Sequence, residues 1–476
     1  MLFDEHGRAV AAAQEEHRQH HPAPGLVEHD PREIVARTHS VAAAALAQAG
    51  AKARDVAALG ITNQRETVVI WDRETGQPVH NAIVWQDTRT AALIERLADD
   101  AGPDVLREQT GLPLSTYFSG PKLTWLIENE GLAARAAAGE LLCGTIDCWL
   151  LWCLTGGTQS GVHATDLTNA SRTLLMDLRS GAWHRPALEL MGIPEAMLPR
   201  IRASGARYGT VAEGPLTGVA VCALVGDQQA ALWGQDCRRA GEAKCTYGTG
   251  AFLLQHSGRE VIHDRALLAT AAATLEGEPA AFALEGSIAD AGSAVRWLRD
   301  GLGLIAQADD VEQLAASVPD NGGVYFVPAF SGLFAPHWRS DARGTIVGLT
   351  AFANAGHLAR ATLEGVAWQV RDVLDGAVAA TGTPCAELRV DGGMTVDDLL
   401  LQIQADVLGV PVRRGAEREA TALGAALIAG AVAGVYDAQF AREGDGGCFE
   451  PAADAAWRER EGARWRAAVE RAVGWA

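Results

Sequence analysis

Residues 219–233 read VAVCALVGDQQAALW, and this stretch decides the fold class. Its first seven residues form a continuous apolar run, which is typical of a strand buried on both faces. The run stops at Gly226-Asp227, and a helical segment follows at once. The same order of strand, glycine turn and helix recurs after Leu284–Ile288 and after Leu388–Val390. Repetition of this unit predicts an α/β protein with mixed sheets.

Local patterns place the other elements. Asp30-Pro31 resembles a helix N-cap followed by proline at the first helical position, which predicts a helix to about Gln48. A short strand is predicted over 55–61, ending at 62–66, and a hairpin follows with arms 68–71 and 79–85. Residues 88–140 are predicted to be mostly helical. Two strands are predicted within 244–255, around the turn 247–250.

The composition bounds the function. The chain has 476 residues and a formal net charge of −19, with 48% hydrophobic and 21% charged residues, which fits a globular protein and excludes a disordered or fibrous one. An acidic chain repels phosphate backbones and anionic lipid, so we expect no nucleic-acid partner and no membrane insertion. The eight cysteines lack CxxC spacing and predict reduced, buried thiols in a cytoplasmic protein.

The length suggests at least two domains. The polar, glycine-containing stretch 236–242 is the most plausible division, giving domains of residues 1–238 and 239–476 that enclose a cleft. Only three lysines occur in the chain, at positions 52, 122 and 244. Lys122 and Lys244 stand out because they fall inside stretches that other patterns single out.

Three glycine turns lie between a strand and a helix or second strand, at YGTG (247–250), EGSIADAG (285–292) and DGG (391–393). Such turns expose backbone N–H groups, and phosphates bind there readily, although any α/β protein also uses glycine in tight turns. Neither a GxxxxGK[ST] motif nor a GxGxxG motif after a strand is present, which disfavours a Walker-type ATPase and a Rossmann dehydrogenase.

Asp227 ends the quoted strand, where a carboxylate can accept the proton of a hydroxyl group, or can simply cap the next helix. Arg65-Glu66 is either a surface ion pair or a set of donors and acceptors for a polyol. Trp85 and Phe252 are core residues or walls of a ligand site. His17, His20 and His21 lack metal-ligand spacing. Together these features indicate a two-domain phosphotransferase with a polyol acceptor.

The chain resembles the FGGY carbohydrate kinase family along nearly its whole length. The matching stretches are GITNQRET (60–67), YFSGPKLTWLIEN (117–129), GTIDCWLLWCLTGG (144–157), TNASRTLL (168–175), GDQQAALWGQ (226–235), KCTYGTGAFLL (244–254), LEGSI (284–288), WLRDGL (297–302), GVYFVPAFSGL (323–333), ARGTIVGLT (342–350), LRVDGG (388–393), LGVPV (408–412) and TALGAA (421–426). NQRET combined with GDQQAA is the pairing associated with glycerol rather than with pentoses.

The resemblance implies two actin- and hexokinase-like (ribonuclease H-like) domains that close over a central cleft. It implies transfer of the ATP γ-phosphate to a terminal hydroxyl of glycerol, with Mg²⁺ as cofactor and a homodimer or homotetramer as the assembly. Because glycerol offers little apolar area, its recognition must come from satisfying every hydroxyl in a dry pocket.

Site residues follow from the same resemblance. Asp227 is expected to be the general base and to contact Mg²⁺ through water. The residues expected around glycerol are Arg65, Glu66, Trp85, Tyr117, Asp227, Gln228 and Phe252, and those expected around the nucleotide are Thr249, Gly292, Arg296, Gly393 and Asp397.

The sequence departs from the family in two places. Members begin with a strand and a turn of the type Asp-x-Gly-Thr-Thr-Ser-x-Arg, whereas Met1–Asp4 matches the strand after that turn. Either the start codon is placed too late, or the chain is a silent glycerol-binding protein; another FGGY sugar kinase is the second enzymatic alternative. Arg296 and Asp397 stand where glutamine and asparagine are expected.

Overall fold

The quoted stretch forms the centre of a three-stranded sheet. The computed structural model, which describes residues 1–440 and 445–476, orders this sheet as β12 (Gly205–Thr210), β13 (Ala220–Gly226) and β4 (Leu59–Asn63). Val221 and Leu224 of β13 join one apolar cluster, whereas Cys222 and Val225 join another. The continuous apolar run of β13 therefore serves two cores, one on each side of the sheet.

A four-stranded sheet follows in the same half, in the order β3 (Glu28–His29), β6 (Ala82–Ile83), β5 (Val68–Asp72) and β7 (Leu141–Thr145). The predicted hairpin is confirmed, since Val68 of β5 pairs with Ile83 of β6 in antiparallel register. Its second arm is shorter than predicted. Only Ala82–Ile83 of the predicted arm 79–85 forms a strand, and before it the Val79 N–H donates to the Ile70 carbonyl at 3.0 Å.

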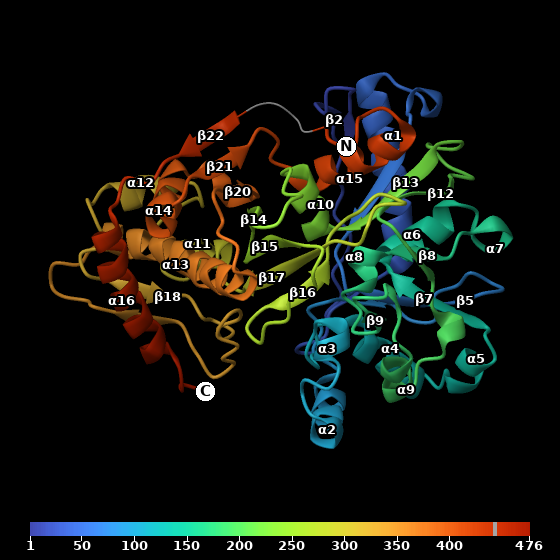
Figure 1. Ribbon diagram of the computed structural model, residues 1–476, viewed down its shortest axis with the longest axis horizontal. Coiled ribbons are helices and arrows are strands. Elements are labelled where there is room, and N and C mark those ends of the chain that lie inside the picture. Colours follow the sequence, from blue (N-terminus) through green and yellow to red (C-terminus); the bar gives the residue numbers. More distant parts are fainter. Residues whose placement is uncertain (441–444) are drawn as a thin grey trace.

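The second half is built on a seven-stranded sheet. Its order is β16 (Leu268–Ala271), β17 (Phe282–Ile288), β15 (Ala251–Gly258), β14 (Ala243–Tyr247), β20 (Leu388–Asp391), β21 (Val412–Gly415) and β22 (Asp445–Phe449). The predicted pair of strands around residues 247–250 is thus β14 and β15. Figure 1 shows the two halves side by side, with β15–β17 between them.

Short strands complete both halves. They are β1 (Leu2–Phe3) with β2 (Ala9–Ala11), β8 (Ala164–Asp166) with β11 (Arg200–Arg202), β9 (Met176–Asp177) with β10 (Ala182–Trp183), and β18 (Tyr325–Val327) with β19 (Thr345–Val347). In the described part of the chain, strand β1 pairs only with β2.

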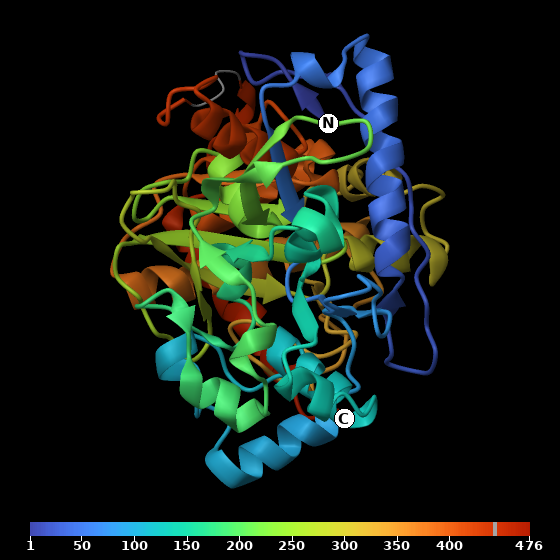
Figure 2. The ribbon, with the colours of Figure 1, turned by 90° about the vertical axis from the view of Figure 1, so that its right-hand side faces the viewer.

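Helices cover the sheets. In the first half they are α1 (Pro31–Ala49), α2 (Ala91–Ala101), α3 (Arg107–Thr110), α4 (Ser119–Asn129), α5 (Ala133–Ala137), α6 (Ile146–Leu154), α7 (Gly157–Ser160), α8 (Leu167–Ala170), α9 (Arg185–Met191) and α10 (Asp227–Gly234). Those after it are α11 (Gly292–Asp300), α12 (Asp310–Ala316), α13 (Ala355–Thr381), α14 (Asp398–Leu408), α15 (Ala420–Ala433) and α16 (Ala455–Ala472). Figure 2 shows α1 along one flank of the first half.

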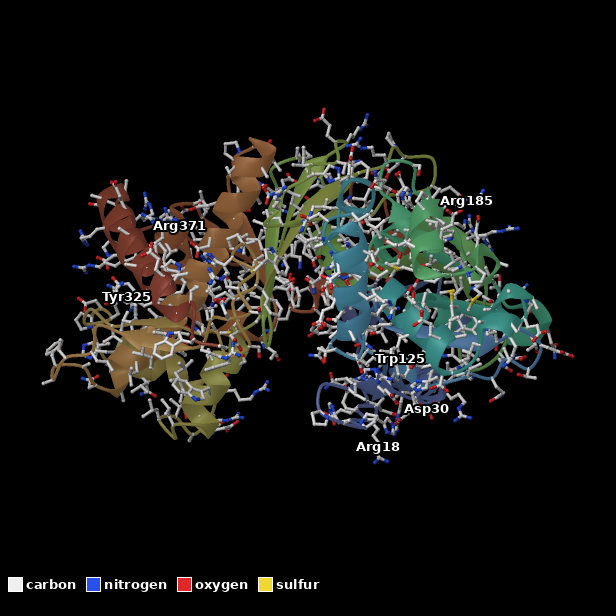
Figure 3. All side chains as sticks on the ribbon, turned by 90° about the horizontal axis from the view of Figure 1, so that it is seen from below. Arg18, Asp30, Trp125, Arg185, Tyr325 and Arg371 are labelled. Carbon is white, nitrogen blue, oxygen red and sulfur yellow. The ribbon has the colours of Figure 1, made fainter. Side chains whose placement is uncertain are left out.

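The predicted start of α1 is confirmed. Asp30 accepts a hydrogen bond from the Arg32 N–H at 2.9 Å, and Pro31 occupies the first turn. In Figure 3, Asp30 and Trp125 lie in the first half, and Tyr325 and Arg371 lie in the second. Within the described residues, none of the helices is long and apolar enough to span a membrane.

Helix α15 belongs to the second half by sequence but packs on the first. It contacts α10, β13 and β4, and Figure 1 shows it beside β13. Gly60 of β4 permits this approach, because a Cβ there would lie 2.4 Å from the carbonyl oxygen of Ala425. The division after residue 238 stays a prediction.

Candidate active site

Parallel pairing brings two polar loops to one edge of the first sheet. Strands β4 and β13 run parallel, with Asn63 opposite Gly226, so Arg65-Glu66 and Asp227 emerge together. Asp227 Oδ1 lies 3.0 Å from Arg65 Nε, and the Asp227 side chain keeps 33% of its surface exposed. The carboxyl ends of parallel strands are the usual place for ligands in α/β proteins.

Asp227 does not cap helix α10. Gly226 occupies the N-cap position, and no side chain makes the capping hydrogen bond. The Asp227 carboxylate accepts from the Gln228 backbone N–H at 2.7 Å and from the Gln228 side-chain Nε2 at 3.4 Å, and it also faces Arg65. The structural interpretation of Asp227 as an N-cap is therefore wrong, and its carboxylate is available to a ligand.

Arg65 and Glu66 do not form a surface ion pair with each other. Their exposed fractions are 3% and 2%, and each pairs with residues far away in the sequence. Glu66 has a φ of 62°, and the Thr67 N–H donates to the Arg65 carbonyl at 2.7 Å, so the chain makes a three-residue turn. A left-handed glutamate is rare, and such strained conformations cluster at functional sites.

Glu285 of β17 connects the two halves through a buried charge network. Arg65 donates to both of its carboxylate oxygens, at 2.5 and 3.1 Å, and Arg172 Nη2 lies 3.1 Å from Glu285 Oε1. Arg172 Nε also donates to Glu66 Oε1 at 2.7 Å. Burial alone would raise the pKa of Glu285, but the charges of Arg172 and Arg65 lower it to about 2.

An aromatic pair lies next to this network. The rings of Trp85 and Tyr117 meet edge to face at 5.5 Å, and the Arg172 guanidinium lies 5.6 Å from the Tyr117 ring. Burial, together with the Glu66 charge, raises the pKa of Tyr117, which keeps its hydroxyl protonated. Lys122 fixes the adjoining backbone by donating to the carbonyls of residues 116, 117 and 118, at 2.7, 2.6 and 3.1 Å.

Gln228 and Phe252 approach the same site from opposite halves. Gln228 is the second residue of α10 and is 6% exposed, and Phe252 lies half-buried on β15. The ammonium group of Lys244 donates to the Gln228 Oε1 and, at 3.4 Å, to the Phe252 carbonyl. The seven residues predicted around glycerol thus lie in one cluster, connected through Arg172, Glu285 and Lys244.

The glycine turns of the second half converge at another sheet edge. Strands β14 and β20 are parallel, with Thr246 opposite Asp391, so the turns 247–250 and 391–393 emerge together. The N–H groups of Gly292 and Ser293 donate to the carbonyls of Gly248 and Thr249, at 3.0 and 2.9 Å. The Gly292 N–H is therefore engaged within the protein, whereas Thr249 and Gly393 are exposed.

Arg296 and Asp397, which stand where the family pattern predicts glutamine and asparagine, flank these turns. Arg296 is exposed on α11. Asp397 caps α14 by accepting from the Leu400 N–H at 2.8 Å, and its Oδ2 is buried without a hydrogen-bond partner among the described residues. Burial, and secondarily the charge of Glu312, raises the pKa of Asp397 to about 6.

At this site, Mg²⁺ would need substrate oxygens as additional ligands. Among the described residues, no group of three or more His, Cys, Asp or Glu side chains is arranged to hold a metal ion. Mg²⁺ in phosphoryl-transfer sites usually binds one or two carboxylates together with waters and phosphates. The partly exposed Asp227 carboxylate fits that shared arrangement.

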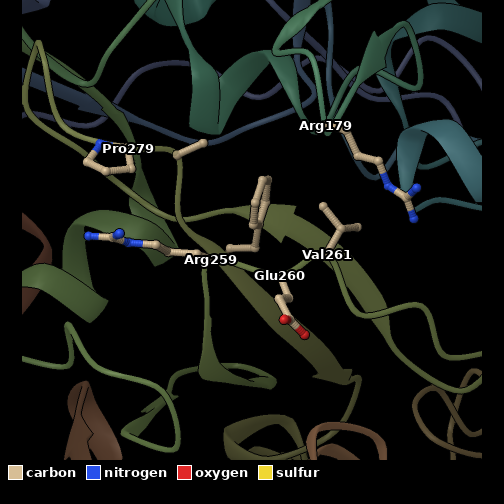
Figure 4. A pocket seen from close by; sticks show the side chains of 7 residues that line it. Arg179, Arg259, Glu260, Val261 and Pro279 are labelled. Carbon is tan, nitrogen blue, oxygen red and sulfur yellow. The ribbon is translucent and has the colours of Figure 1, made fainter.

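A surface pocket of about 550 Å³ lies away from this cluster, lined by residues that include Arg179, Arg259 and Phe282. Figure 4 shows Arg179 and Arg259 on opposite sides of the pocket, with their guanidinium groups pointing apart. This pocket therefore offers no convergent set of polar groups.

Two family profiles match the chain. The N-terminal domain of the FGGY family of carbohydrate kinases matches residues 1–234, and the C-terminal domain of that family matches residues 243–433. The chain belongs to the FGGY family of carbohydrate kinases. The FGGY fold of two mixed α/β domains is the one predicted from the sequence, and the resemblance is confirmed.

Individual relatives are similar over the full chain. Glycerol kinase 2 of Streptomyces avermitilis is 54% identical, and the match covers 100% of this chain and 94% of the relative. A glycerol kinase of Saccharopolyspora erythraea is 52% identical, with coverage of 100% and 96%. The crystal structure of Plasmodium falciparum glycerol kinase with ADP superposes with a TM-score of 0.92 at 35% identity, covering 99% of this chain and 95% of that one.

Three buried charged residues of this FGGY site were absent from the predicted set: Arg172, Glu285 and Lys244. Arg172 and Glu285 lie inside the matching stretches TNASRTLL and LEGSI. A glutamate in a strand that is otherwise buried throughout requires a cationic partner, and this pattern at Glu285 would have revealed the network.

Proposed function

We propose that this protein transfers the γ-phosphoryl group of ATP to a terminal hydroxyl of glycerol, giving sn-glycerol 3-phosphate and ADP. The observation that supports this proposal most directly is the position of the Asp227 carboxylate, which lies 3.0 Å from Arg65 at the sheet edge where β4 and β13 end. The full-length similarity to glycerol kinases supports glycerol over the pentuloses and gluconate used by other sugar kinases.

In the proposed reaction, Asp227 accepts the proton of the attacking hydroxyl. The glycerol oxygen forms a bond to the γ-phosphorus while the bond from that phosphorus to the β–γ bridging oxygen breaks, and ADP leaves. The Arg65 guanidinium, whose Nε lies 3.0 Å from Asp227 Oδ1, holds this carboxylate in place at the end of the strand. Asp227 would help to hold Mg²⁺, which would supply charge neutralisation during the transfer.

Each remaining predicted residue has a role in binding. Arg65, Glu66, Tyr117 and Gln228 provide donors and acceptors for the hydroxyls, and Trp85 and Phe252 enclose the carbons. On the nucleotide side the proposed contacts are Thr249, Gly292, Arg296, Gly393 and Asp397. Because the Gly292 N–H is already engaged, Gly292 contributes there by its lack of a side chain: a Cβ would lie 2.6 Å from the Gly248 carbonyl oxygen.

The test is release of ADP by the purified full chain with ATP, Mg²⁺ and glycerol, compared with xylulose and gluconate. We expect glycerol to give the highest kcat/KM, and Asp227→Asn to lower kcat by about 10²–10⁴-fold while calorimetry still detects glycerol binding. A parent protein that binds glycerol but releases no ADP would instead be the silent binding protein. If the Asp227→Asn variant keeps a kcat within about tenfold of the parent, Asp227 is rejected as the base.

Cellular location and assembly belong to the same proposal. The eight cysteines are all free thiols, which supports a cytoplasmic location. A homodimer or homotetramer stays a prediction, and light scattering of the purified chain will measure the mass of the assembly.

A further inference from the structure

Lys244 is a fully buried cation at the junction of the two halves. It lies on β14, its exposed fraction is 0%, and β14 contacts α10 (Figure 1). Burial lowers the pKa of Lys244, whereas the negative charges of Asp391, Asp227 and Glu285 oppose that shift. A buried ammonium group without partners would be costly, so its hydrogen bonds define its role.

The protein uses every donor of Lys244. Its ammonium donates to Gln228 Oε1, to Thr246 Oγ1 at 2.8 Å and to the Phe252 carbonyl at 3.4 Å. An ammonium group has three N–H donors and no acceptor. No donor is left for a substrate or phosphate, so Lys244 acts through the residues that it holds.

The contact with Lys244 decides how the Gln228 amide is oriented. Because Lys244 can only donate, the amide oxygen must face it, and the amide nitrogen then faces Asp227, with Nε2 3.4 Å from Oδ2. The opposite orientation would place NH₂ against an ammonium group and a carbonyl oxygen against a carboxylate. A cation on one side and an anion on the other therefore lock the amide.

This orientation places a donor next to an acceptor at the reacting end of the site. We propose that Lys244 is a positioning residue: it fixes the Gln228 amide so that the substrate hydroxyl accepts a hydrogen bond from Gln228 Nε2 and directs its own proton to Asp227. The proposal rests on the proposed function. It makes Gln228 a donor toward glycerol, and it explains why a strand of the second half reaches a helix of the first.

A double-mutant cycle tests the coupling. Lys244→Met, Gln228→Ala and the double variant are compared with the parent by steady-state ADP release at varied glycerol. We expect each single change to lower kcat by about 10- to 100-fold with a glycerol KM within about fivefold of the parent, because misorientation affects the reacting geometry. The double variant should be within about threefold of Gln228→Ala, since Lys244 acts through Gln228.

Lys52 provides the matched control, because it is exposed and remote from the network. Lys52→Met should leave kcat unchanged. The proposal would be overturned if the two losses of kcat multiplied in the double variant, or if the kcat of Lys244→Met equalled that of the parent.

Gln228→Glu covers the case in which Lys244→Met does not fold. Its carboxylate still accepts from Lys244 but has no hydrogen to donate toward Asp227, so kcat should fall at least about tenfold while circular dichroism shows that the variant is folded. Parent-like kcat would overturn the proposal. If the parent itself releases no ADP with glycerol, the proposed function fails, and calorimetry with glycerol decides the inference. A double variant that binds glycerol as Gln228→Ala does supports the inference, whereas additive weakening in the double variant or no binding by the parent overturns it.

Discussion

Replacing Glu285 by glutamine tests the buried charge network that joins the two halves. The change keeps the shape of the side chain but removes the negative charge that Arg65 and Arg172 share. Removing one partner of a buried ion pair costs about 3–5 kcal/mol, because the remaining charge stays desolvated.

The pKa of Glu285 gives an independent magnitude. Its lowering from 4.5 to about 2 corresponds to roughly 3 kcal/mol of stabilisation of the ionised form. Because the pKa of the folded state lies below that of the unfolded state, this stabilisation is present above about pH 4.5 and is lost as the pH falls toward 2. Both routes predict that Glu285→Gln lowers the free energy of unfolding by about 3–5 kcal/mol at pH 7.

Urea unfolding followed by circular dichroism measures this quantity. Glu276→Gln is the matched control, because Glu276 pairs with Arg202 at 2.8 Å but keeps 65% of its side chain exposed, and exposed pairs contribute about 0–1 kcal/mol. If the two variants lose the same stability, the network does not hold the halves together as argued. A loss confined to Glu285→Gln that disappears near pH 2 would support it.

Two further predictions concern other buried charges. Asp397→Asn should raise the free energy of unfolding by roughly 2–3 kcal/mol at pH 7.5, because the pKa of Asp397 is about 6 in the folded state against 3.8 in the unfolded state, so that ionisation of this carboxyl destabilises the fold as the pH rises through this range. Urea unfolding at several pH values should show that the gain vanishes below about pH 4. A gain that is the same at every pH would contradict the prediction. Lys122→Met should lower the melting temperature and raise the glycerol KM, because three backbone carbonyls near Tyr117 lose their donor at a cost of about 1–3 kcal/mol each. Calorimetry measures the melting temperature, and steady-state kinetics measures the KM. An unchanged KM would show that Lys122 does not support the glycerol site.

Local sequence patterns located the elements, while the buried network required the three-dimensional structure. The run before Asp227 is apolar throughout, so the strand and the emergence of Asp227 at its end were predictable. The partners of Arg65 were not, because Gln229 and Glu285 lie 164 and 220 residues away along the chain. Without those partners, Arg65-Glu66 has the pattern of an exposed ion pair.

The contact between the glycine turns could also not be predicted from local sequence patterns. Each turn taken alone predicts exposed N–H groups, but the Gly292 N–H donates to the Gly248 carbonyl, which lies in the turn 247–250, more than forty positions earlier.

The packing of α15 against β4 and β13 has a consequence for synthesis on the ribosome. Strand β13 ends at Gly226 and α15 ends at Ala433, so roughly 200 residues must be added before the apolar side of the first sheet is covered, which takes about 10–40 s at typical elongation rates. During that interval the nascent chain exposes Cys222, Val225 and their neighbours to solvent. Chaperone capture of stalled nascent chains should therefore decline once residue 433 has left the exit tunnel.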